Sequence, residues 1–280
     1  MKYWMNLPEE YRNGRFIILP IAYEKDLTYG QGTSKGPTEI IKASEHLEYY
    51  DEQFGCEPFV EGIQLLPEIK AETPEEMVEK VSAIVKDNQS NFIIGLGGDH
   101  SVTIGLVKGQ EQLHQDFSVI IFDAHADFRD SWNNSVLNHA CVSKQLSKRH
   151  DLALLGIRSM DIDEAKQINQ SKNVHLLKAH DFSLSKLKEV LPKLKDKVYI
   201  SIDVDVFDPS FIRNTGTPEP GGLSWKEVTD SLQEIFRQKE IVGADIVEFS
   251  PQENYRVEAY SLAKLVYKLF ALIHKKDTLH

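Results

Sequence analysis

The sequence predicts an α/β protein with three layers, in which helices cover both faces of a mostly parallel sheet. Apolar segments of strand length alternate with longer helical patterns over nearly the whole chain. Several strand segments are almost entirely apolar, such as Val-Ile-Ile-Phe at 119–122, and this pattern is typical of parallel strands buried on both faces. Together the two observations indicate an αβα arrangement.

The individual elements follow from the same patterns. Seven strands are predicted from apolar runs, at 16–21, 92–96, 118–122, 152–156, 174–177, 198–204 and 241–247. One helix, 38–50, follows a Gly-Pro start signal, and another, 74–87, follows Thr73, which has the character of an N-cap. The other predicted helices are 102–114, 184–194, 224–238 and 257–274.

The chain shows no internal repeat, low-complexity tract or Gly/Ser-rich linker, so we expect a single domain over residues 1–280. The Pro- and Gly-rich segment 208–222 follows a predicted strand and is too short to be a domain boundary. We expect it to form a loop at the carboxyl end of that strand, where open α/β sheets bind their ligands.

Composition leads us to expect a cytoplasmic protein. Hydrophobic residues make up 41% and charged residues 27%, which fits a globular protein with a sizeable core. The net charge of −11 argues against nucleic acid or an anionic membrane as partner, and slightly favours a cationic small molecule. The two cysteines, Cys56 and Cys141, fit a reducing compartment. Neither a signal peptide nor an apolar stretch of membrane-spanning length is visible.

Three clusters of acidic and imidazole residues each follow an apolar strand: Gly-Gly-Asp-His at 97–100, Asp-Ala-His-Ala-Asp at 123–127 and Asp-Val-Asp at 203–205. Because burying an unpaired carboxylate is costly, these acids at the mouth of a buried sheet need compensating positive charge. The clusters contain no lysine, and Arg129 is the only basic residue close by. Bound metal ions are therefore the simplest explanation.

The spacing of the second cluster favours two ions over one. Asp123, His125 and Asp127 stand at i, i+2 and i+4, so an extended chain would direct all three to one face. The outer two Cα atoms would be roughly 13 Å apart, which suits two neighbouring ions bridged by Asp123 or Asp203. Oxygen and nitrogen donors without a thiolate favour Mn²⁺, with Ni²⁺, Co²⁺ or Fe²⁺ as alternatives.

The charge of such a centre favours a cationic substrate. Two dications carry about +4 and four carboxylates about −4, so one added hydroxide leaves a net charge of roughly −1. Glu248, directly after the 241–247 strand, would add another negative charge if it faces the same site. A guanidinium is a biological cation that is also a hydrolysable carbon centre, so we expect a small guanidino compound.

Taken in order, these motifs resemble those of the arginase/agmatinase ureohydrolase family, and the resemblance covers nearly the full length. They are Gly-Gly-Asp-His-Ser at 97–101, Asp-Ala-His-Ala-Asp at 123–127 and Ser-Ile-Asp-Val-Asp-Val-Phe-Asp-Pro at 201–209. The resemblance implies an arginase-like fold and a hydrolase that uses two Mn²⁺ ions to split urea from its substrate. It also implies a homotrimer or homohexamer, to which the 257–274 helix could contribute.

The resemblance further implies roles for single residues. His100 and Asp127 would bind one ion, and His125 and Asp205 would bind the other. Asp123 and Asp203 would bridge the two ions. Glu248, in Asp-Ile-Val-Glu-Phe-Ser-Pro, would hold and orient the guanidinium. His139 would pass a proton to the leaving amine, although this chain has Asn-His-Ala where many members have glycine after the histidine.

Within the family, the sequence favours agmatine or N1-aminopropylagmatine over arginine, and hence a role in polyamine synthesis. Arginases follow the second motif with Asn, Ser and Thr residues that hold the amino acid's carboxylate, whereas this chain has Phe-Arg-Asp-Ser-Trp at 128–132. The segment Gly-Thr-Pro-Glu-Pro-Gly-Gly at 216–222 resembles the agmatinase version of that loop. Three acidic residues could meet a distal amine: Asp130, Glu219 and Glu253.

Several alternatives stay open at this point. Arginase, guanidinobutyrase and formimidoglutamase activities lie within the family, and Arg129 could bind the carboxylate of formimidoglutamate. A binuclear phosphoesterase could use the same ligands but would need a basic or amide-rich pocket. A non-catalytic homologue would be expected to have lost ligands, and all six are present. Asp99 could be a helix cap or a partner of a ligand instead of a ligand.

Overall fold

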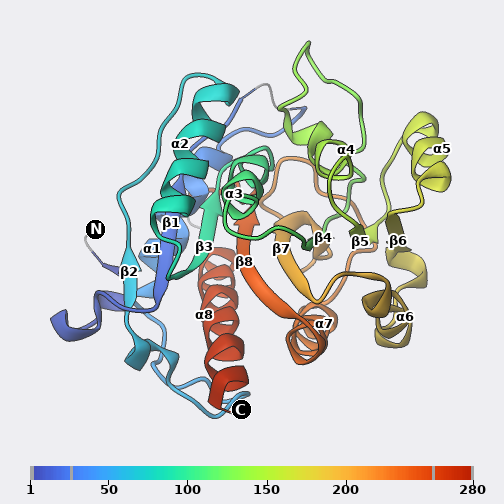
Figure 1. Ribbon diagram of the computed structural model, residues 1–280. Coiled ribbons are helices and arrows are strands. Elements are labelled where there is room, and N and C mark those ends of the chain that lie inside the picture. Colours follow the sequence, from blue (N-terminus) through green and yellow to red (C-terminus); the bar gives the residue numbers. More distant parts are fainter. Residues whose placement is uncertain (1–2, 26–27, 254–255, 279–280) are drawn as a thin grey trace.

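In the computed structural model, which describes residues 3–25, 28–253 and 256–278, one sheet runs through the molecule (Figure 1). Its eight strands have the order β2-β1-β3-β8-β7-β4-β5-β6, and every pairing is parallel, which confirms and extends the predicted mostly parallel sheet. The strands are β1 (Phe16–Ile21), β2 (Ile63–Leu65), β3 (Phe92–Gly97), β4 (Ser118–Phe122), β5 (Leu152–Ile157), β6 (Val174–Lys178), β7 (Lys197–Asp203) and β8 (Glu240–Val247).

Helices cover both faces of this sheet, so the three-layer αβα prediction is confirmed (Figure 1). Alternate residues of a strand point to opposite faces. Phe16 and Ile18 of β1 accordingly pack in one core with α1, α6, α7 and α8, whereas Ile17 and Leu19 pack in a second core with α2, α3, α4 and α5. The helices are α1 (Gly36–Ser44), α2 (Pro74–Asp87), α3 (Val102–Gln110), α4 (Val142–Leu146), α5 (Ile162–Gln170), α6 (Leu184–Val190), α7 (Trp225–Gln238) and α8 (Val257–Thr278).

The seven predicted strands are confirmed, each with ends within one residue of those expected. Two helix starts also follow their capping residues: Thr73 accepts a hydrogen bond from the backbone N–H of Glu76 at 3.2 Å, and Ser224 forms a capping box with Glu227. The helix predicted at 224–238 therefore begins one residue later, because Ser224 is its cap.

Other boundaries were predicted wrongly. Strand β2 and helices α4 and α5 were missed, since β2 has three residues and α4 has five, too few for a periodic pattern. Helix α1 ends at Ser44, α3 at Gln110 and α6 at Val190, all earlier than expected. A 3-10 turn at Leu191–Lys193 replaces the last part of the helix predicted at 184–194, because Pro192 has no N–H to donate. Helix α8 instead continues beyond 274.

The four central strands β3, β8, β7 and β4 lie side by side and bring the polar motifs to one edge. Strands β3 and β4 follow each other in the sequence, yet β8 and β7 lie between them in the sheet. Open α/β sheets bind ligands where the strand order changes in this way, outside the carboxyl ends of the strands. The segments 97–101, 123–127 and 203–205, and Glu248, all follow these four strands.

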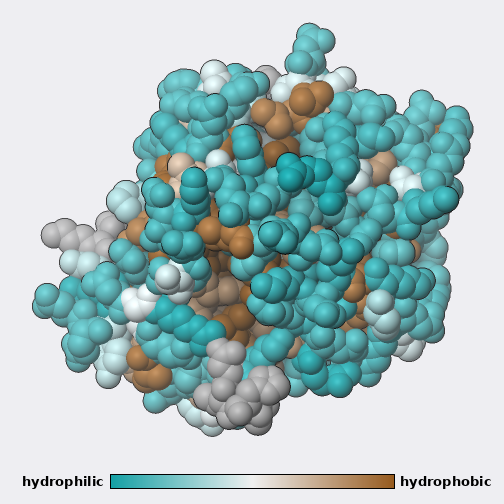
Figure 2. Space-filling view, viewed as in Figure 1, coloured by the Kyte–Doolittle hydropathy of each residue, from teal (hydrophilic) through white to brown (hydrophobic). Residues whose placement is uncertain are grey.

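The apolar residues of the strands are almost completely covered. Every residue of β1, β3, β4 and β5 is buried, as expected of parallel strands between two helical layers. Figure 2 shows a mainly hydrophilic face on which hydrophobic residues gather in a hollow near the centre. None of the helices in the described part of the chain is both long enough and apolar enough to cross a membrane.

Candidate metal centre

The side chains predicted as metal ligands converge at the carboxyl ends of β3, β4 and β7. His100 lies in the turn between β3 and α3, Asp123 directly follows β4, and Asp203 is the last residue of β7. Four of the six residues are almost fully buried: His100, Asp123, Asp203 and Asp205. The side chains of Asp127 and His125 are 11% and 23% exposed, so the centre is accessible from their side.

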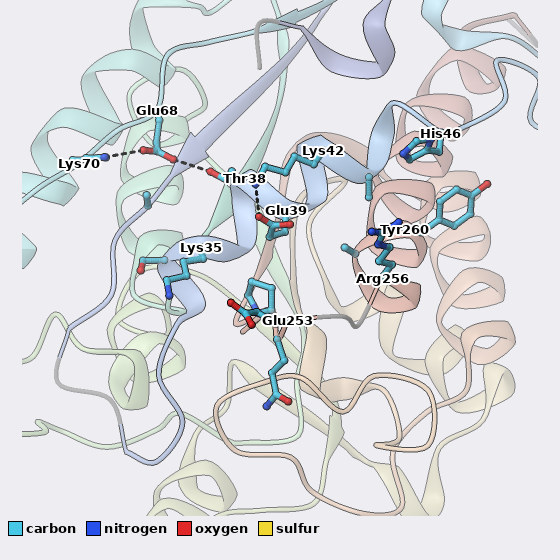
Figure 3. Close-up of a pocket in the computed structure, with 16 residues that line it drawn as sticks. Lys35, Thr38, Glu39, Lys42, His46, Glu68, Lys70, Glu253, Arg256 and Tyr260 are labelled. Carbon is cyan, nitrogen blue, oxygen red and sulfur yellow. Dashed lines mark hydrogen bonds and ion pairs between the residues drawn. The ribbon is translucent and has the colours of Figure 1, made fainter.

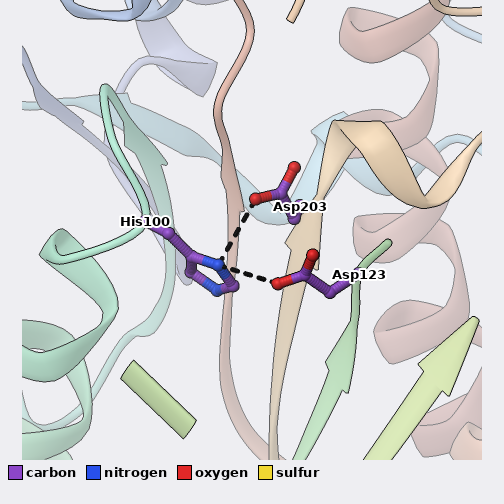
Figure 4. Close-up of side chains that lie close together, drawn as sticks. All are labelled: His100, Asp123 and Asp203. Atoms are coloured by element: carbon purple, nitrogen blue, oxygen red, sulfur yellow. Dashed lines mark ion pairs between the residues drawn. The ribbon is translucent and has the colours of Figure 1, made fainter. Parts of the chain in front are cut away.

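One group of donors surrounds the Nδ1 atom of His100. This atom lies 3.1 Å from Oδ2 of Asp123, 3.2 Å from Oδ2 of Asp127 and 3.3 Å from Oδ2 of Asp203. Figure 4 shows that His100, Asp123 and Asp203 come from three different strand ends and point toward one another. Their donor atoms lie within 4.8 Å of one another, an arrangement that can hold a metal ion.

A second group of donors forms around His125, beside the first. Nδ1 of His125 lies 2.8 Å from Oδ2 of Asp205 and 3.7 Å from Oδ1 of Asp123. Asp123 therefore directs one carboxylate oxygen to each imidazole and joins the two groups. The segment 123–127 is not a regular strand, because Asp127 has a positive φ of 49°, so this turn and not simple alternation brings its outer carboxylates together.

Backbone amides hold three of the carboxylates in place. The N–H of His125 donates to Oδ1 of Asp123 at 2.6 Å, that of Asp205 to Oδ1 of Asp203 at 2.9 Å, and that of Ala124 to Oδ1 of Asp205 at 2.9 Å. In each acid the other oxygen, Oδ2, faces an imidazole. One oxygen of each acid is thus fixed by the fold and the second is directed into the centre; the fixed oxygen of Asp123 also lies 3.7 Å from Nδ1 of His125.

The donor set fits a pair of divalent cations. Nδ1 of His100 and Oδ2 of Asp123 are buried and, although 3.1 Å apart, have no partner with hydrogen-bond geometry among the described residues. Leaving a buried polar atom unsatisfied costs about 1–3 kcal/mol, so such atoms usually mark a bound ion, water or functional role. The donors are all oxygen and nitrogen, the ligands that Mn²⁺ and similar ions accept.

The acids of the centre repel one another. Burial raises the pKa of Asp203 well above its usual range, and the charges of Asp205 and Asp123 raise it further. Burial, with the charge of Asp123, also raises the pKa of Asp127 to about 7. A bound cation would reverse these shifts, because an adjacent positive charge favours the ionised carboxylate.

The imidazoles respond to the same acids in the opposite sense. Burial lowers the pKa of His125, but the contacts with Asp123 and Asp205 outweigh burial and raise that pKa to about 12. For His100, burial is likewise outweighed by the neighbouring carboxylates, and its pKa lies well above the usual value. Without metal, protons on the imidazoles therefore supply the charge that cations would supply.

Glu248 is placed beside this centre by a strained backbone. Its φ of 67° lies in the left-handed region, which costs a residue other than glycine about 1–3 kcal/mol and is common at functional sites. Its N–H donates to the carbonyl of Gly98 at 2.8 Å, and its Oε1 accepts from the N–H of His100 at 2.7 Å. Glu248 is 7% exposed and lines the same cavity as the ligands.

That cavity has a volume of about 290 Å³, and His139 is also among its lining residues. Nε2 of His139 forms a 2.9 Å hydrogen bond with Oγ1 of Thr28, which links the segment after β1 to the segment after β4. The cavity wall also includes Tyr29 and Gly30, and Gly30 donates its N–H to the carbonyl of Gly216. Sequence analysis missed Thr28, Tyr29 and Gly30, because they follow no strand directly and match no pattern used.

The remaining polar candidates separate clearly. Asp99 accepts hydrogen bonds from the backbone N–H of Lys25 at 2.8 Å and from that of Ser101 at 2.9 Å, so it connects two loops. These contacts are neither with the first turn of α3 nor with a predicted ligand, so they do not confirm the helix-cap or ligand-partner alternative. Arg129 lines the cavity, but its guanidinium pairs with Asp161 at 2.8 Å.

The three acids considered for a distal amine lie in different places. Glu219 lines the cavity, with Oε1 3.9 Å from Nε2 of His125. Asp130 is exposed and faces Lys144 Nζ at 3.4 Å. Glu253 lines a different cavity. Of the three, Glu219 is thus the one that the structure places beside the metal centre.

This other cavity, of about 1030 Å³, shares no lining residue with the metal centre. It lies between α1, the start of α8 and the segment around Glu68 (Figure 3). Lys42 pairs with Glu39 at 2.7 Å and Lys70 with Glu68 at 3.3 Å on its wall. Its size does not make it the chemical site, because it has neither the converging donors nor the backbone strain of the smaller cavity.

Comparisons with known proteins agree with this geometry. A sequence model of the arginase family matches residues 14–271. The chain is 36% identical to the N(1)-aminopropylagmatine ureohydrolase of Thermus thermophilus, over 94% of this chain and 91% of that protein. It is 32% identical to the agmatinase of Pyrococcus horikoshii, over 96% and 95% of the two chains. The agmatine ureohydrolase structure from Thermoplasma volcanium matches with a TM-score of 0.89 at 27% identity, over 100% and 96%, which confirms the arginase-like fold.

Proposed function

The chain belongs to the arginase family, and we propose that it is a manganese-dependent ureohydrolase that splits urea from N1-aminopropylagmatine or agmatine. Asp123 carries this proposal, because its two oxygens lie 3.1 Å from Nδ1 of His100 and 3.7 Å from Nδ1 of His125. A carboxylate placed in this way can join two divalent ions, which binuclear hydrolases hold about 3.5–4 Å apart.

The ligand assignment follows the two donor groups. We assign His100 and Asp127 to one ion and His125 and Asp205 to the other. Asp123 and Asp203 are assigned to both ions. When bound, the ions supply Lewis acidity and activate water at neutral pH. The oxygen and nitrogen donors support Mn²⁺ over a metal that requires thiolates.

Glu248 binds the guanidinium in this proposal. Burial raises its pKa well above the usual range, and the negative charge of Asp99 adds to that rise. A guanidinium beside the carboxylate would favour its ionised form, so substrate binding and ionisation support each other. Since Glu248 is held against His100, the substrate carbon is oriented toward the side of the cavity where the carboxylates converge.

His139 serves as the proton carrier in this proposal. Its Nε2 is oriented by the hydroxyl of Thr28, and its ring lines the cavity that contains Glu248. An imidazole titrates near neutral pH when unperturbed, so it can accept a proton from water and return it to the amine nitrogen that leaves. This role depends on position alone, and it is distinct from metal binding.

The cavity wall supports a substrate with a positively charged tail. Glu219 presents a carboxylate near His125, and its backbone carbonyl accepts a 2.8 Å hydrogen bond from Nη2 of Arg158, which anchors the loop. Arg129, the candidate for binding a substrate carboxylate, is already paired with Asp161. These contacts favour a polyamine precursor over arginine or formimidoglutamate, in agreement with the names of the relatives from Thermus thermophilus and Pyrococcus horikoshii. The same acids disfavour a phosphate ester.

We also propose that the enzyme works in the cytoplasm as a homotrimer or homohexamer, without nucleic acid or membrane as partner. The net charge of −11 supports the last point. Val257 and Tyr260, 69% and 41% exposed on the first turns of α8, support a contact between copies of the chain.

A urea-release assay on the manganese-loaded protein tests the proposal, with N1-aminopropylagmatine, agmatine, arginine, guanidinobutyrate and formimidoglutamate as substrates. We expect the first two to have the highest kcat/KM. The Glu248→Gln variant should keep both ions, counted by elemental analysis, and lose at least about 10²-fold in kcat. Phosphate release from generic esters without urea release, or two bound ions without turnover of any guanidine, would contradict the proposal.

A further inference from the structure

A chain of buried hydrogen bonds lies behind His100, inside the sheet. Nε2 of His100 is 3.0 Å from Oγ of Ser201, and this hydroxyl donates to Oδ1 of Asp245 at 2.7 Å. His100 is 1% exposed, and Ser201 and Asp245 are completely buried. We refer to these three residues as the relay. Ser201 contacts Nε2 of the His100 ring, whereas Nδ1 of the same ring faces the carboxylates of the metal centre.

The pairing of β7 with β8 builds the relay. Ser201 lies directly opposite Asp245 in the strand register. Tyr199, Ser201 and Asp203 alternate along β7, so their side chains share one face of the sheet. Tyr199 donates its hydroxyl hydrogen to Oδ2 of Asp245 at 2.7 Å, which leaves Oδ1 for Ser201. The carboxylate is therefore held by two hydroxyls from the adjacent strand.

The donors and acceptors of the relay determine which ring nitrogen of His100 carries the hydrogen. A serine hydroxyl has one hydrogen, and Ser201 gives it to Asp245, so it can only accept from His100 and from the hydroxyl of Thr103, whose Oγ1 lies 3.2 Å away. Nε2 of His100 must carry the donated hydrogen, and the lone pair of the neutral ring is left on Nδ1. That nitrogen is the one beside Asp123 and Asp127. The relay thus selects the tautomer that can bind a metal ion.

The second imidazole, that of His125, has no such support among the residues that the structure describes. Nδ1 of His125 also faces the metal centre, 2.8 Å from Oδ2 of Asp205. The acid nearest its Nε2 is Glu219, a loop residue 3.9 Å away whose side chain is 37% exposed. The two predicted ions therefore differ in what stands behind their histidines. His100 is backed by the sheet interior, and His125 by the cavity.

We propose that Asp245 and Ser201 are positioning residues that hold His100 in its metal-binding tautomer, so that their loss weakens one of the two metal sites and spares the other. The proposal rests on the binuclear centre proposed above. Its physical basis is general, because partners on the far nitrogen of a ligating histidine set the ring's tautomer and orientation, and their removal typically lowers metal affinity about 10–100-fold.

Asp245→Asn is the decisive variant. The amide keeps the shape of Asp245, but its NH₂ group can donate to Ser201, whose hydroxyl then turns toward His100 and favours hydrogen on Nδ1, where the ion should bind. Mn²⁺ titration of metal-stripped protein, followed by the electron paramagnetic resonance of free Mn²⁺, measures both sites without any assay of activity. We expect one of the two sites to lose about 10–100-fold in affinity and the other to stay within about twofold.

Two further variants separate positioning from simple damage to the core. Ser201→Ala removes the acceptor without imposing the wrong tautomer, so its loss at the same site should be smaller. Tyr199→Phe removes the other hydrogen bond of the same carboxylate but leaves the link from Asp245 to His100 intact. It should lower the unfolding temperature of the metal-free protein at least as much as Asp245→Asn and leave both affinities near wild type.

Three results would overturn the proposal. Equal weakening of both sites in Asp245→Asn is one, and a loss in Tyr199→Phe as large as in Asp245→Asn is another. Binding of fewer than two ions by the wild-type protein would refute the relay and the binuclear centre together. Two well-behaved sites with the expected pattern, in a protein that releases no urea, would leave the relay standing and refute the proposed activity.

Discussion

Buried acids at two places in this protein are compensated in different ways. Asp51, in the segment after α1, is completely buried and lies 3.1 Å from Nζ of Lys268 on α8. Asp123 and Asp203, at the carboxyl edge of the sheet, are nearly as buried and face the imidazole of His100 at 3.1 and 3.3 Å. Among the described residues, neither of these two has a lysine or arginine ion pair.

The difference separates an acid that serves the fold from acids that serve a ligand. Lysine carries a permanent charge at neutral pH, so the Asp51–Lys268 pair is complete as soon as the chain folds. The carboxylates of the metal centre outnumber their imidazoles, and the raised pKa of Asp203 reflects burial and repulsion that the fold leaves uncompensated. A set of acids that the protein does not neutralise itself is a site for an exchangeable cation.

The largest effect is expected where a permanent partner is removed. Lys268→Met removes the nearer cation of the buried Asp51, leaves Lys264 at 4.0 Å, and should lower the free energy of unfolding by about 3–5 kcal/mol. Because the metal centre is separate, Mn²⁺ should not restore this loss. Denaturant unfolding with and without Mn²⁺ measures both quantities.

Lys264→Met is the matched control on the same helix. Lys264 pairs with the exposed Glu52 at 2.9 Å and approaches Asp51 only to 4.0 Å, so its loss should cost less than about 1 kcal/mol. Similar costs for the two variants, or rescue of Lys268→Met by Mn²⁺, would show that the two regions are not distinct in the way described.

Removal of the metal should have the next largest effect, and that effect should depend on pH. Mn²⁺ present at about 100 times its dissociation constant adds roughly 3 kcal/mol to the free energy of unfolding. In the metal-free protein, burial and the charges of Asp205 and Asp123 raise the pKa of Asp203, and the acids around His125 raise its pKa to about 12 although burial opposes them.

Both shifts make the folded metal-free protein bind more protons than the unfolded chain near neutral pH, so its stability should fall as the pH rises. For Asp203 the loss begins near the unfolded pKa of about 4, and for His125 near about 6.5, and each continues toward the folded value. Metal displaces these protons, so the stabilisation by Mn²⁺ should grow from about pH 6 to about pH 8. Unfolding of chelated and loaded protein at these pH values measures it, and a gain that does not change with pH would contradict the assignment.

The same contrast explains which features the sequence could predict. The candidate metal ligands could be selected from the sequence because acids directly after apolar strands are conspicuous in a single sequence, and parallel strands end at a common edge. The fold class and seven strands could be predicted because apolar runs are also visible in a single sequence. A three-residue edge strand such as β2 carries too little pattern to be recognised.

Pairings between distant side chains could not be predicted. Asp51 and Lys268 are 217 residues apart, and Thr28 and His139 are 111 apart, so only packing in three dimensions brings them together. Asp245 gave a signal that the sequence analysis did not use: an acid inside an apolar strand needs a buried partner. Its partners on β7 became evident only from the strand register.

The smallest effect is the most discriminating, because its sign differs between the two regions. Asp203→Asn replaces a buried carboxyl, whose ionised form Asp205 and Asp123 repel, with a neutral amide whose oxygen can still accept the backbone N–H of Asp205. The metal-free variant should therefore be more stable than wild type, by about 1 kcal/mol at pH 8, where wild-type folding must hold this carboxyl against ionisation. Titration should show weaker Mn²⁺ binding in the same variant. Asp51→Asn, which leaves the buried Lys268 with only the exposed Glu52 at 3.7 Å as counter-ion, should instead destabilise the protein with or without Mn²⁺. If Asp203→Asn destabilises the metal-free protein as Asp51→Asn does, then Asp203 contributes to the fold in the same way as Asp51, and the carboxyl edge is not kept unneutralised for a cation.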